Sequence, residues 1–567
     1  MDFQEKLPRD KIFKDPVYGY ISIPRKYIPI IDSSSFQRLR RISQTSYSPL
    51  YSSALHNRFV HSMGVFHLAR MAMDTIKHDD DSLAYFNEES EDGVKYFDIF
   101  ELAALLHDIG HSPFSHTGEK YYLCDEEHED RSQLHSELKE LVDDYNFTLD
   151  IDALEVEYAN PHEIMSAIIG LKYFPHYFNN SAARSFFARC ITGYQYGNSE
   201  TKRNIDSKEK LLNCLITLLN SKVIDVDKLD YLIRDAYIIG YDTINIDYVR
   251  LLKSITIVQN IKEHIYELAF RKSAVSVIEN VIYARDAEKK WIQGHPVVLY
   301  ESYLVQEIIQ EYIKSFSELA FSSKSLSPDG IIIETEKDKG VDGTFIRLLC
   351  DDDIIVFAKN KMSDNPTSRQ YFERSLRMHA FWKSEAEFNT KLLKDMTDSG
   401  KKAVKLIMDK TIRPKKEDRV VIVNDQFRNS ILNMREKDED KANLRGLDIK
   451  TSLTEYDAQL RLTDFLLKYA DEKHTPRSFV LMSANSFSSG FDSREFKSLK
   501  IKFDGDHFWR LDKVIPTLDL EKQEKIKEEE PPLFYIFYSR NEEEDYNDLC
   551  DRLTECFNSI GRELNLN

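Results

Sequence analysis

The sequence lacks the features that mark membrane, secreted and zinc-ribbon proteins. No stretch of its 567 residues approaches the roughly 18 consecutive apolar residues that a membrane helix needs. The opening MDFQEKLPRDKIFKDP places no apolar run behind basic residues, so we expect no secretory signal and a cytoplasmic protein. The six cysteines show no CxxC spacing, which favours reduced thiols over disulfides or structural zinc.

An excess of basic residues is also missing. Asp and Glu (96) outnumber Lys and Arg (77), which gives a formal net charge of -19. This acidity disfavours broad binding to nucleic acid, which depends on neutralising phosphates with Lys and Arg. Apolar and aromatic residues make up 42% of the chain, enough to bury large cores, and its length predicts two or more domains. We therefore expect a folded protein without membrane or nucleic-acid partners.

Helical periodicity dominates the first half of the chain. A small β-hairpin is predicted from residues 254–258 and 264–270, where apolar residues alternate. The predicted helices cover residues 33–44, 58–77, 98–109, 162–171, 208–220, 227–237 and 273–292. In the helix at 33–44, Asp32 or a serine is the expected N-cap.

The second half reads as mixed α and β. A polar segment rich in Ser, Pro and Gly at 322–330 is the best candidate for a boundary, so we predict domains at 1–325 and 326–567. Short apolar runs predict buried strands at 419–424, 478–484 and 533–539. The predicted fold class is mainly α, with a helical core, a small β-hairpin and a mixed α/β accessory or regulatory region at the C-terminal end.

The segment LLHDIGHSPFSH (105–116) concentrates side chains that bind metals. A His-Asp dipeptide at a helix end supplies an imidazole nitrogen and a carboxylate oxygen, which suit iron, manganese, zinc or nickel. His61 shares a helical face with Arg58, and Asp227 is in register with Tyr231 and Asp235 at four-residue steps on another helix. We predict that one metal ion is bound by His61, His107, Asp108 and Asp227.

Isolated histidines on helices are more often ordinary core or surface residues. We assign no role on these grounds to His56, His67, His128, His135 and His176. The metal interpretation is favoured for His61, His107 and Asp108, because the ordinary interpretation requires three coincidences in the correct order.

Several separated motifs occur in one order along the chain. They are DPVYGYISI (15–23), IIDSSSFQRLRRISQ (30–44), HNRFVHSMGV (56–65), LLHDIGHSPFSH (105–116), HE (162–163) and DVDKLDYLIRDAYIIG (225–240). Together they resemble the HD-domain deoxynucleoside triphosphate triphosphohydrolases, most closely the branch of the vertebrate SAM-and-HD-domain dNTPase, without the SAM domain. The resemblance implies an HD-domain helical core that hydrolyses dNTPs to deoxynucleoside and inorganic triphosphate.

The resemblance also implies roles for other residues. The catalytic residues carry over to His111, His116, His162 and Glu119, where Glu119 replaces a family aspartate that orients the catalytic histidine. Phosphate contacts carry over to Arg58, His116, Lys228, Tyr231 and Arg285, and sugar contacts to Gln44 and Asp235. A triphosphate carries about four negative charges and calls for several cationic donors. Mg²⁺ is expected to accompany it. For Arg285, pairing with Glu279 or Asp286 is an equal alternative.

Other positions bear on specificity and regulation. Thr45 occupies the position where the family branch has a leucine that excludes a 2′-hydroxyl. Gln293-Gly294-His295 occupies the position of a family Tyr-x-His motif that packs on the nucleoside, which makes His295 a candidate substrate contact. The residues that match an activating-nucleotide site between subunits are Asp32, Gln37 and Arg40. This implies a nucleotide-activated homo-oligomer, a dimer or tetramer. The plain alternative for Asp32 is a helix N-cap, contributing about 1 kcal/mol.

The mechanistic hypothesis combines the metal with the histidines. The metal lowers the pKa of a bound water to about 7, and the hydroxide attacks the α-phosphorus. His111 or His162 holds or protonates the reacting oxygens, and His116 stabilises or protonates the leaving group. Two alternatives stay open, an HD-domain phosphodiesterase or nuclease acting on cyclic or oligonucleotides and a nucleotide-sensing scaffold. The idea that the enzyme depletes dNTPs in antiviral defence rests on no residue of the chain.

Overall fold

The computed structural model describes most of the chain. The described residues are 10–79, 90, 92–122, 132–154, 159–197, 204–241, 244–260, 265–316, 321–334, 343–411, 420–445, 450–484, 499–503, 508–515, 531–540 and 546–566. Within these ranges, no helix combines the length and the apolar character that crossing a bilayer requires. The cytoplasmic location stays a prediction.

The chain forms two compact units, each assembled from separate stretches. Unit 1 comprises Met1–Glu288, Val305–Ser363 and Gly490–Leu518, and unit 2 comprises Lys289–Leu304, Asp364–Ser489 and Asp519–Asn567. The chain therefore passes between the units several times. None of the boundaries between the units falls between residues 325 and 326. The predicted domain boundary at that position stays a prediction.

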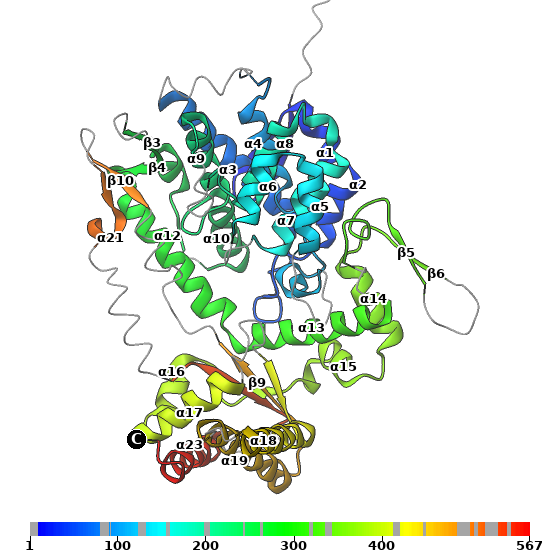
Figure 1. Cartoon of the computed structure of the whole chain (residues 1–567), viewed down its shortest axis with the longest axis vertical. Coiled ribbons are helices and arrows are strands. Elements are labelled where there is room, and N and C mark those ends of the chain that lie inside the picture. The colour runs from blue at the N-terminus through cyan, green and yellow to red at the C-terminus, as the bar shows by residue number, and fades with distance from the viewer. Residues whose placement is uncertain are drawn as a thin grey trace, which may run out of the picture. The chain divides into compact units, whose positions relative to one another are not determined.

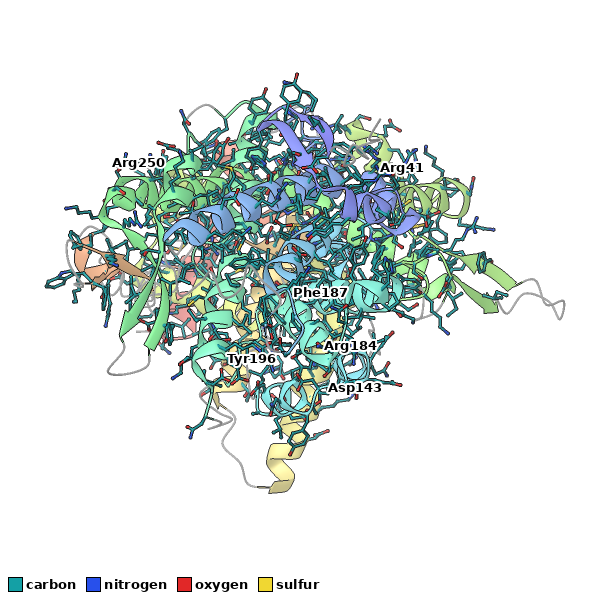
Figure 2. The ribbon with its side chains drawn as sticks, turned by 90° about the horizontal axis from the view of Figure 1, so that it is seen from above. Arg41, Asp143, Arg184, Phe187, Tyr196 and Arg250 are labelled. Carbon is teal, nitrogen blue, oxygen red and sulfur yellow. The ribbon has the colours of Figure 1, made fainter. Side chains whose placement is uncertain are left out.

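Unit 1 is mainly helical, as the periodicity predicts (Figure 1). Helix α4 (Tyr96–Leu106) is apolar on nearly all sides and buried along its length, as expected of a helix in a core. Phe187 lies inside the unit, where Gly170 leaves room for its ring, whereas Arg250 is exposed at the surface (Figure 2). The other main helices are α3 (Arg58–Asp79), α5 (Ser132–Val142), α6 (Tyr145–Asp152), α7 (Pro161–Tyr173), α8 (Ser181–Thr192), α9 (Ser207–Leu219), α10 (Val226–Ile239), α11 (Tyr248–Lys253), α12 (Val275–Glu288) and α14 (Asp351–Lys361).

Small sheets accompany these helices. Strands β1 (Lys11–Asp15) and β2 (Gly19–Ile23) form an antiparallel hairpin. The predicted hairpin is confirmed as β3 (Ile255–Asn260) and β4 (Ile265–Arg271), and β4 pairs in parallel with β10 (Lys500–Lys502). The remaining strands among the described residues of unit 1 are β5 (Ile331–Glu334), β6 (Gly343–Ile346) and β11 (Phe508–Arg510).

Two predicted helices differ from the structure. The helix expected at 33–44 is a short α2 (Ser34–Arg38) followed by a single 3-10 turn (Leu39–Arg41), because Arg38 turns inward and bonds to backbone carbonyls of other segments. The helix expected at 273–292 consists of α12 preceded by a 3-10 turn and followed by a π-helical turn (Lys289–Gln293). The fold class, mainly α with small β elements, is confirmed.

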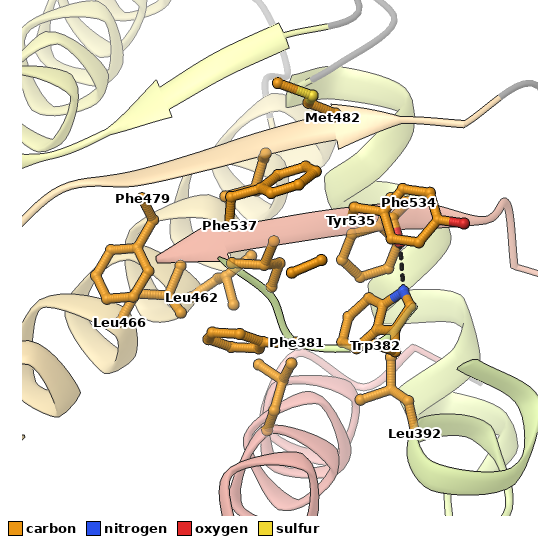
Figure 3. Packing of buried hydrophobic residues seen from close by; sticks show 14 of the residues in the cluster. Phe381, Trp382, Leu392, Leu462, Leu466, Phe479, Met482, Phe534, Tyr535 and Phe537 are labelled. Atoms are coloured by element: carbon orange, nitrogen blue, oxygen red, sulfur yellow. Dashed lines mark hydrogen bonds between the residues drawn. The ribbon is translucent and has the colours of Figure 1, made fainter. Parts of the chain in front are cut away.

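Unit 2 packs helices on a four-stranded sheet. The sheet order is β7 (His379–Ala380), β12 (Phe534–Tyr538), β9 (Phe479–Ser483) and β8 (Val420–Val423), so the three predicted strands are confirmed. Every residue of β12 is buried, which makes its aromatic run part of the core. Trp382 donates its Nε1 hydrogen to the carbonyl oxygen of Phe534 at 2.7 Å within this core (Figure 3). The main helices are α17 (Asp398–Thr411), α18 (Asp425–Arg445), α19 (Lys450–Lys473) and α23 (Tyr546–Glu563), and α13 (Pro296–Phe316) begins in this unit.

Candidate metal centre

The four predicted metal ligands converge in unit 1. Nε2 of His61 lies 3.0 Å from Oδ1 of Asp227, 3.3 Å from Nε2 of His107 and 3.5 Å from Oδ2 of Asp108. Nε2 of His107 lies 3.5 Å from Oδ1 of Asp108 and 3.6 Å from Oδ1 of Asp227. Donors about 2.1 Å from one ion lie about 3.0 to 3.4 Å apart at octahedral or tetrahedral angles. The distances are close to this range, so His61, His107 and Asp108 can hold one divalent cation, and Asp227 lies next to both histidines.

Both histidines point Nε2 at the centre of this group. Nδ1 of His107 donates to the Ala104 carbonyl oxygen at 3.0 Å, and a carbonyl can only accept, so Nε2 is left to bind a metal. Nδ1 of His61 lies 2.8 Å from Oδ2 of Asp230, a carboxylate whose pKa is lowered to about 2, chiefly by Arg234, against the effect of burial. Such outer hydrogen bonds fix the tautomer and the ring orientation of metal-binding histidines.

The charges of the group compensate one another. Burial alone lowers the pKa of His61, but hydrogen bonds to Asp227 and Asp230 raise it to about 10. Burial raises the pKa of Asp108, but the nearby charges of Arg58, His107 and His61 bring it well below its usual range. The carboxylates are thus ionised at neutral pH, and a divalent cation can replace the proton that they hold on His61.

A second group of side chains surrounds Glu119. Its Oε2 accepts from Nδ1 of His116 at 2.9 Å and its Oε1 accepts from Nδ1 of His162 at 2.6 Å. His111 stacks on His162 with ring centroids 4.1 Å apart, and its Nε2 lies 3.3 Å from Oδ1 of Asp108. The predicted catalytic residues His111, His116, His162 and Glu119 are therefore brought together beside a predicted metal ligand. Glu119 contacts two histidines where the sequence predicted one.

The stacked histidines differ in protonation. Burial lowers the pKa of His162, but the charge of Glu119 and its hydrogen bond raise it to about 9. Burial and the nearby charges of Arg58 and His162 hold the pKa of His111 well below its usual range. At neutral pH the His162 ring is therefore protonated and can donate a proton, whereas the His111 ring is neutral. Two neighbouring groups whose pKa values are shifted in opposite directions are typical of acid and base pairs in active sites.

The predicted phosphate contacts lie at different distances from this centre. Arg58 is next to it, since its Nη1 donates to Oδ2 of Asp108 and its Nε to Oγ of Ser115, both at 2.8 Å. Lys228 donates to Oδ2 of Asp225 at 2.7 Å, and Asp225 is the N-cap of α10. The structure thus gives Lys228 a helix-capping partner that the sequence analysis did not foresee.

Arg285 and Tyr231 lie near each other. Burial raises the pKa of Tyr231, and the charge of Arg285 partly opposes this rise. Nη1 of Arg285 donates to the carbonyl oxygen of Lys222 at 3.3 Å. Their phosphate-binding roles stay predictions.

The two predicted sugar contacts are linked through His56. Nε2 of His56 lies 2.7 Å from Oδ1 of Asp235, and both side chains are buried. The backbone N–H of Gln44 donates to the carbonyl oxygen of His56 at 3.0 Å. The sequence analysis assigned no role to His56, yet its side chain contacts the predicted substrate residue Asp235. Its position two residues before Arg58, in the same motif, could have indicated that it lies near the site. Among the other histidines set aside, His135 bonds to the hydroxyl of Tyr194 in the core, and His128 lies outside the described residues.

The residues predicted to bind an activator lie close together along the chain. Ser33, and not Asp32, is the N-cap of α2, so the plain capping alternative for Asp32 is wrong. Oδ1 of Asp32 lies 3.2 Å from Nζ of Lys11. Oε1 of Gln37 accepts from Nε of Arg40 at 2.9 Å, which orients the Arg40 guanidinium over the ring of Phe59. Activator binding stays a prediction.

His295 belongs to unit 2, whereas the other predicted site residues belong to unit 1. Its Nδ1 accepts from the backbone N–H of Val297 at 3.2 Å, at the start of α13. Its substrate-binding role stays a prediction.

Asp230 is a site residue that the sequence analysis missed. It is fully buried and accepts from Nδ1 of His61, the hydroxyl of Tyr18 at 2.7 Å and the guanidinium of Arg234. A Cβ on Gly64 would lie 1.9 Å from Oδ1 of Asp230, so only glycine lets α10 approach α3 this closely. The available signal was its spacing of three residues from Asp227, which places both on one helical face.

The substitution Asp230→Asn is expected to weaken metal binding by about 10- to 100-fold, because the amide holds Nδ1 of His61 less firmly. Asp15→Asn is the matched control, since Asp15 also pairs with Arg234 but forms no described contact with His61. Titration with Mn²⁺ or Zn²⁺ against a competing chelator measures both affinities. Equal losses in the two variants would mean that Asp230 acts only through Arg234.

Comparisons with known proteins agree with this geometry. Residues 58–163 match the model of the HD domain family, and this range includes three of the four predicted ligands and the whole Glu119 group. The chain is 28% identical to the uncharacterized protein YwfO of Bacillus subtilis over 306 residues, which cover 54% of this chain and 56% of that protein. It is 29% identical over 261 residues to the deoxynucleoside triphosphate triphosphohydrolase SAMHD1 of Gallus gallus, covering 43% of this chain and 36% of that protein.

A solved structure shows the same fold over nearly the whole chain. It is the crystal structure of a hypothetical protein from Aquifex aeolicus, with a TM-score of 0.50 and 18% identity, and the match covers 97% of this chain and 99% of that one. The chain spans only about half the length of the curated relatives that it matches first. The HD domain match thus covers residues 58–163, and the His/Asp group within it is able to bind a divalent metal.

Proposed function

We propose that this protein is a metal-dependent dNTP triphosphohydrolase that releases a deoxynucleoside and inorganic triphosphate. The observation that carries the proposal is the contact between the four-ligand group and the Glu119 group, made by His111 and Asp108 at 3.3 Å. A site for a cation that binds phosphate thus adjoins a proton donor and a neutral imidazole. Relatives named as dNTP triphosphohydrolases in Gallus gallus, Danio rerio and Dictyostelium discoideum support this substrate class.

The donor set fits a transition metal better than Mg²⁺, because two imidazoles and two carboxylates suit iron, manganese, zinc or nickel. His61, His107, Asp108 and Asp227 would hold the ion. A cation bound there would supply a hydroxide nucleophile at neutral pH, because protein-bound metals can lower the pKa of a bound water to about 7. Mg²⁺ is proposed to enter with the triphosphate.

The protein's own side chains then bind the phosphates and move protons. Arg58 offsets negative charge next to the ligand group and is proposed to hold an α-phosphate oxygen. His162 is protonated at neutral pH and donates from Nε2, because its Nδ1 is already engaged by Glu119. His116, oriented by the other oxygen of Glu119, is proposed to protonate the leaving group. Lys228, Tyr231 and Arg285 are proposed to bind the remaining phosphates, and Gln44 and Asp235 the sugar.

Product analysis tests this proposal. The protein is incubated with each dNTP alone and in pairs, with Mg²⁺ and with Mn²⁺, and the products are separated by ion-exchange chromatography. We expect deoxynucleoside and intact triphosphate in equal amounts, and a faster reaction in those pairs that include the activating nucleotide. Orthophosphate or diphosphate as the first product would contradict the proposal, as would turnover of cyclic or oligonucleotides alone.

A further inference from the structure

A carboxylate far outside the HD domain holds the loop that carries His111 and His116. Asp351 is the first residue of α14, and it is buried although it is charged. Its Oδ1 accepts from the backbone N–H of Phe114 at 2.7 Å, and its Oδ2 accepts from the backbone N–H of Ser43 at 2.8 Å. Asp351 therefore connects two segments that are about 70 residues apart in the sequence, and each lies beside a predicted substrate residue.

The loop needs such support because its backbone is strained. Phe114 and Ser115 have φ angles of 58° and 54°, in the left-handed region that side chains other than glycine rarely adopt. Arg38 holds the residues just before them, since its guanidinium donates to the carbonyl oxygens of Ile109, His111 and Leu349. The Arg38 side chain is buried as well. The segment around Asp351 thus fixes the loop at two places.

Hydrogen bonds link Asp351 to the predicted metal ligands. Oγ of Ser115 donates to the carbonyl oxygen of Ser43 at 2.5 Å and accepts from Nε of Arg58 at 2.8 Å. Arg58 in turn donates to Oδ2 of Asp108 at 2.8 Å. A shift of Phe114 or Ser43 would therefore be passed through Ser115 to Arg58 and Asp108.

We propose that Asp351 is a positioning residue, whose carboxylate holds the 111–116 loop and Ser43 so that Arg58, His111 and His116 face the metal centre. The effect of Asp351 on the rate rests on the proposed function, whereas its effect on the position of the 111–116 loop does not. Asp351 lies outside residues 58–163, so catalysis by the HD domain depends on a segment that the family match does not include. Burial raises the pKa of Asp351 to about 6, so the carboxylate is ionised and accepts both bonds at neutral pH.

The test compares Asp351→Asn with Asp352→Asn in the full chain. Asp352 is the next residue, and it is an exposed partner of Arg41, itself exposed (Figure 2), so its loss leaves the loop untouched. The amide of Asp351→Asn has the same shape but accepts from only one of the two N–H groups. We expect kcat to fall by about tenfold or more with the metal retained, because Arg58, His111 and His116 are displaced while His61, His107 and Asp227 lie outside the loop that Asp351 holds.

Hydrogen exchange measured by mass spectrometry gives a readout that needs no substrate. Peptides that contain Phe114 and Ser43 are expected to exchange about tenfold faster in Asp351→Asn and at the wild-type rate in Asp352→Asn. Activity is measured with a dNTP and with bis(4-nitrophenyl) phosphate, a general phosphodiester probe. Loss of metal from Asp351→Asn would overturn the inference. Asp351 would then be needed for the structure of the whole metal centre and not only for the position of the 111–116 loop.

The remaining outcomes separate the inference from the proposed function. An unchanged kcat, or a lower kcat with unchanged exchange at Phe114, would overturn the positioning role. If the wild type forms no triphosphate from any dNTP, the proposed function fails, and the phosphodiester probe and the exchange rates still decide the role of Asp351.

Discussion

Alanine in place of Asp227 is expected to abolish metal binding and to lower kcat by at least about 10³-fold. Asp227 accepts from Nε2 of His61 at 3.0 Å, and its Oδ1 lies 3.6 Å from Nε2 of His107, so its loss removes both a ligand and one of the negative charges that retain a cation. Its pKa lies well below the usual range because hydrogen bonds from His107 and His61 outweigh burial, so the carboxylate is ionised when a metal arrives.

Metal content by plasma mass spectrometry and initial rates on the same preparation measure this effect. His176→Asn is the control, because His176 is exposed in a 3-10 turn. It should keep about one metal ion per chain and the wild-type rate. Full activity in Asp227→Ala with the metal retained would contradict the assignment of the ligands.

Glutamine in place of Glu119 is expected to move the pH optimum towards acid. In the wild type the pKa of His162 is about 9, so this acid stays protonated through neutral pH and the rate should fall only above about pH 9. Without the carboxylate, the pKa is expected to return to about 6.5, because the group that most strongly opposes burial is lost and only the charges of Glu163 and Asp108 still raise it. At pH 8 about 3% of His162 would be protonated, so the variant should be about 30-fold slower, and acidification should restore much of its rate.

Full pH profiles of kcat measure this shift. Glu137→Gln is a suitable control, since Glu137 pairs with Lys172 and belongs to neither group of the site. Its profile should match that of the wild type. A Glu119→Gln profile that is lower but parallel to the wild type at every pH would mean that Glu119 only supports the loop and does not set the protonation of His162.

The sequence could point to four candidate metal ligands because each lies on a strongly periodic helix or in a dense motif. His61 and Asp227 could be placed on helical faces by spacing alone, and His107 and Asp108 are neighbours. The same reasoning found the buried strands of unit 2, since apolar runs such as Phe534–Tyr538 are typical of a core. Such patterns depend only on neighbouring residues, so they can be recognised without knowledge of the tertiary structure.

The residues that hold the ligands in place left weaker signals. In the sequence, Asp230 cannot be distinguished from an ordinary carboxylate on a helix. Its role depends on the close approach of α10 to α3, which Gly64 allows. Asp351 acts on backbone N–H groups, which every residue except proline carries, so no residue type reveals its partners. The family resemblance implied that Lys228 binds phosphate, but its described partners are Asp225 and the carbonyl oxygen of Ser221, just before α10. Tertiary contacts decided the cases of Asp230 and Asp351, and local contacts before α10 decided that of Lys228.

X-ray absorption at the metal edge of the purified protein, together with an anomalous difference map from its crystals, tests the central claim most directly. The account predicts one strong site, with two imidazole nitrogens and carboxylate oxygens at about 2.0 to 2.2 Å, bonded to His61, His107, Asp108 and Asp227. A metal bound elsewhere, for example by His111, His116 and His162, or no metal under conditions that support turnover, would contradict it.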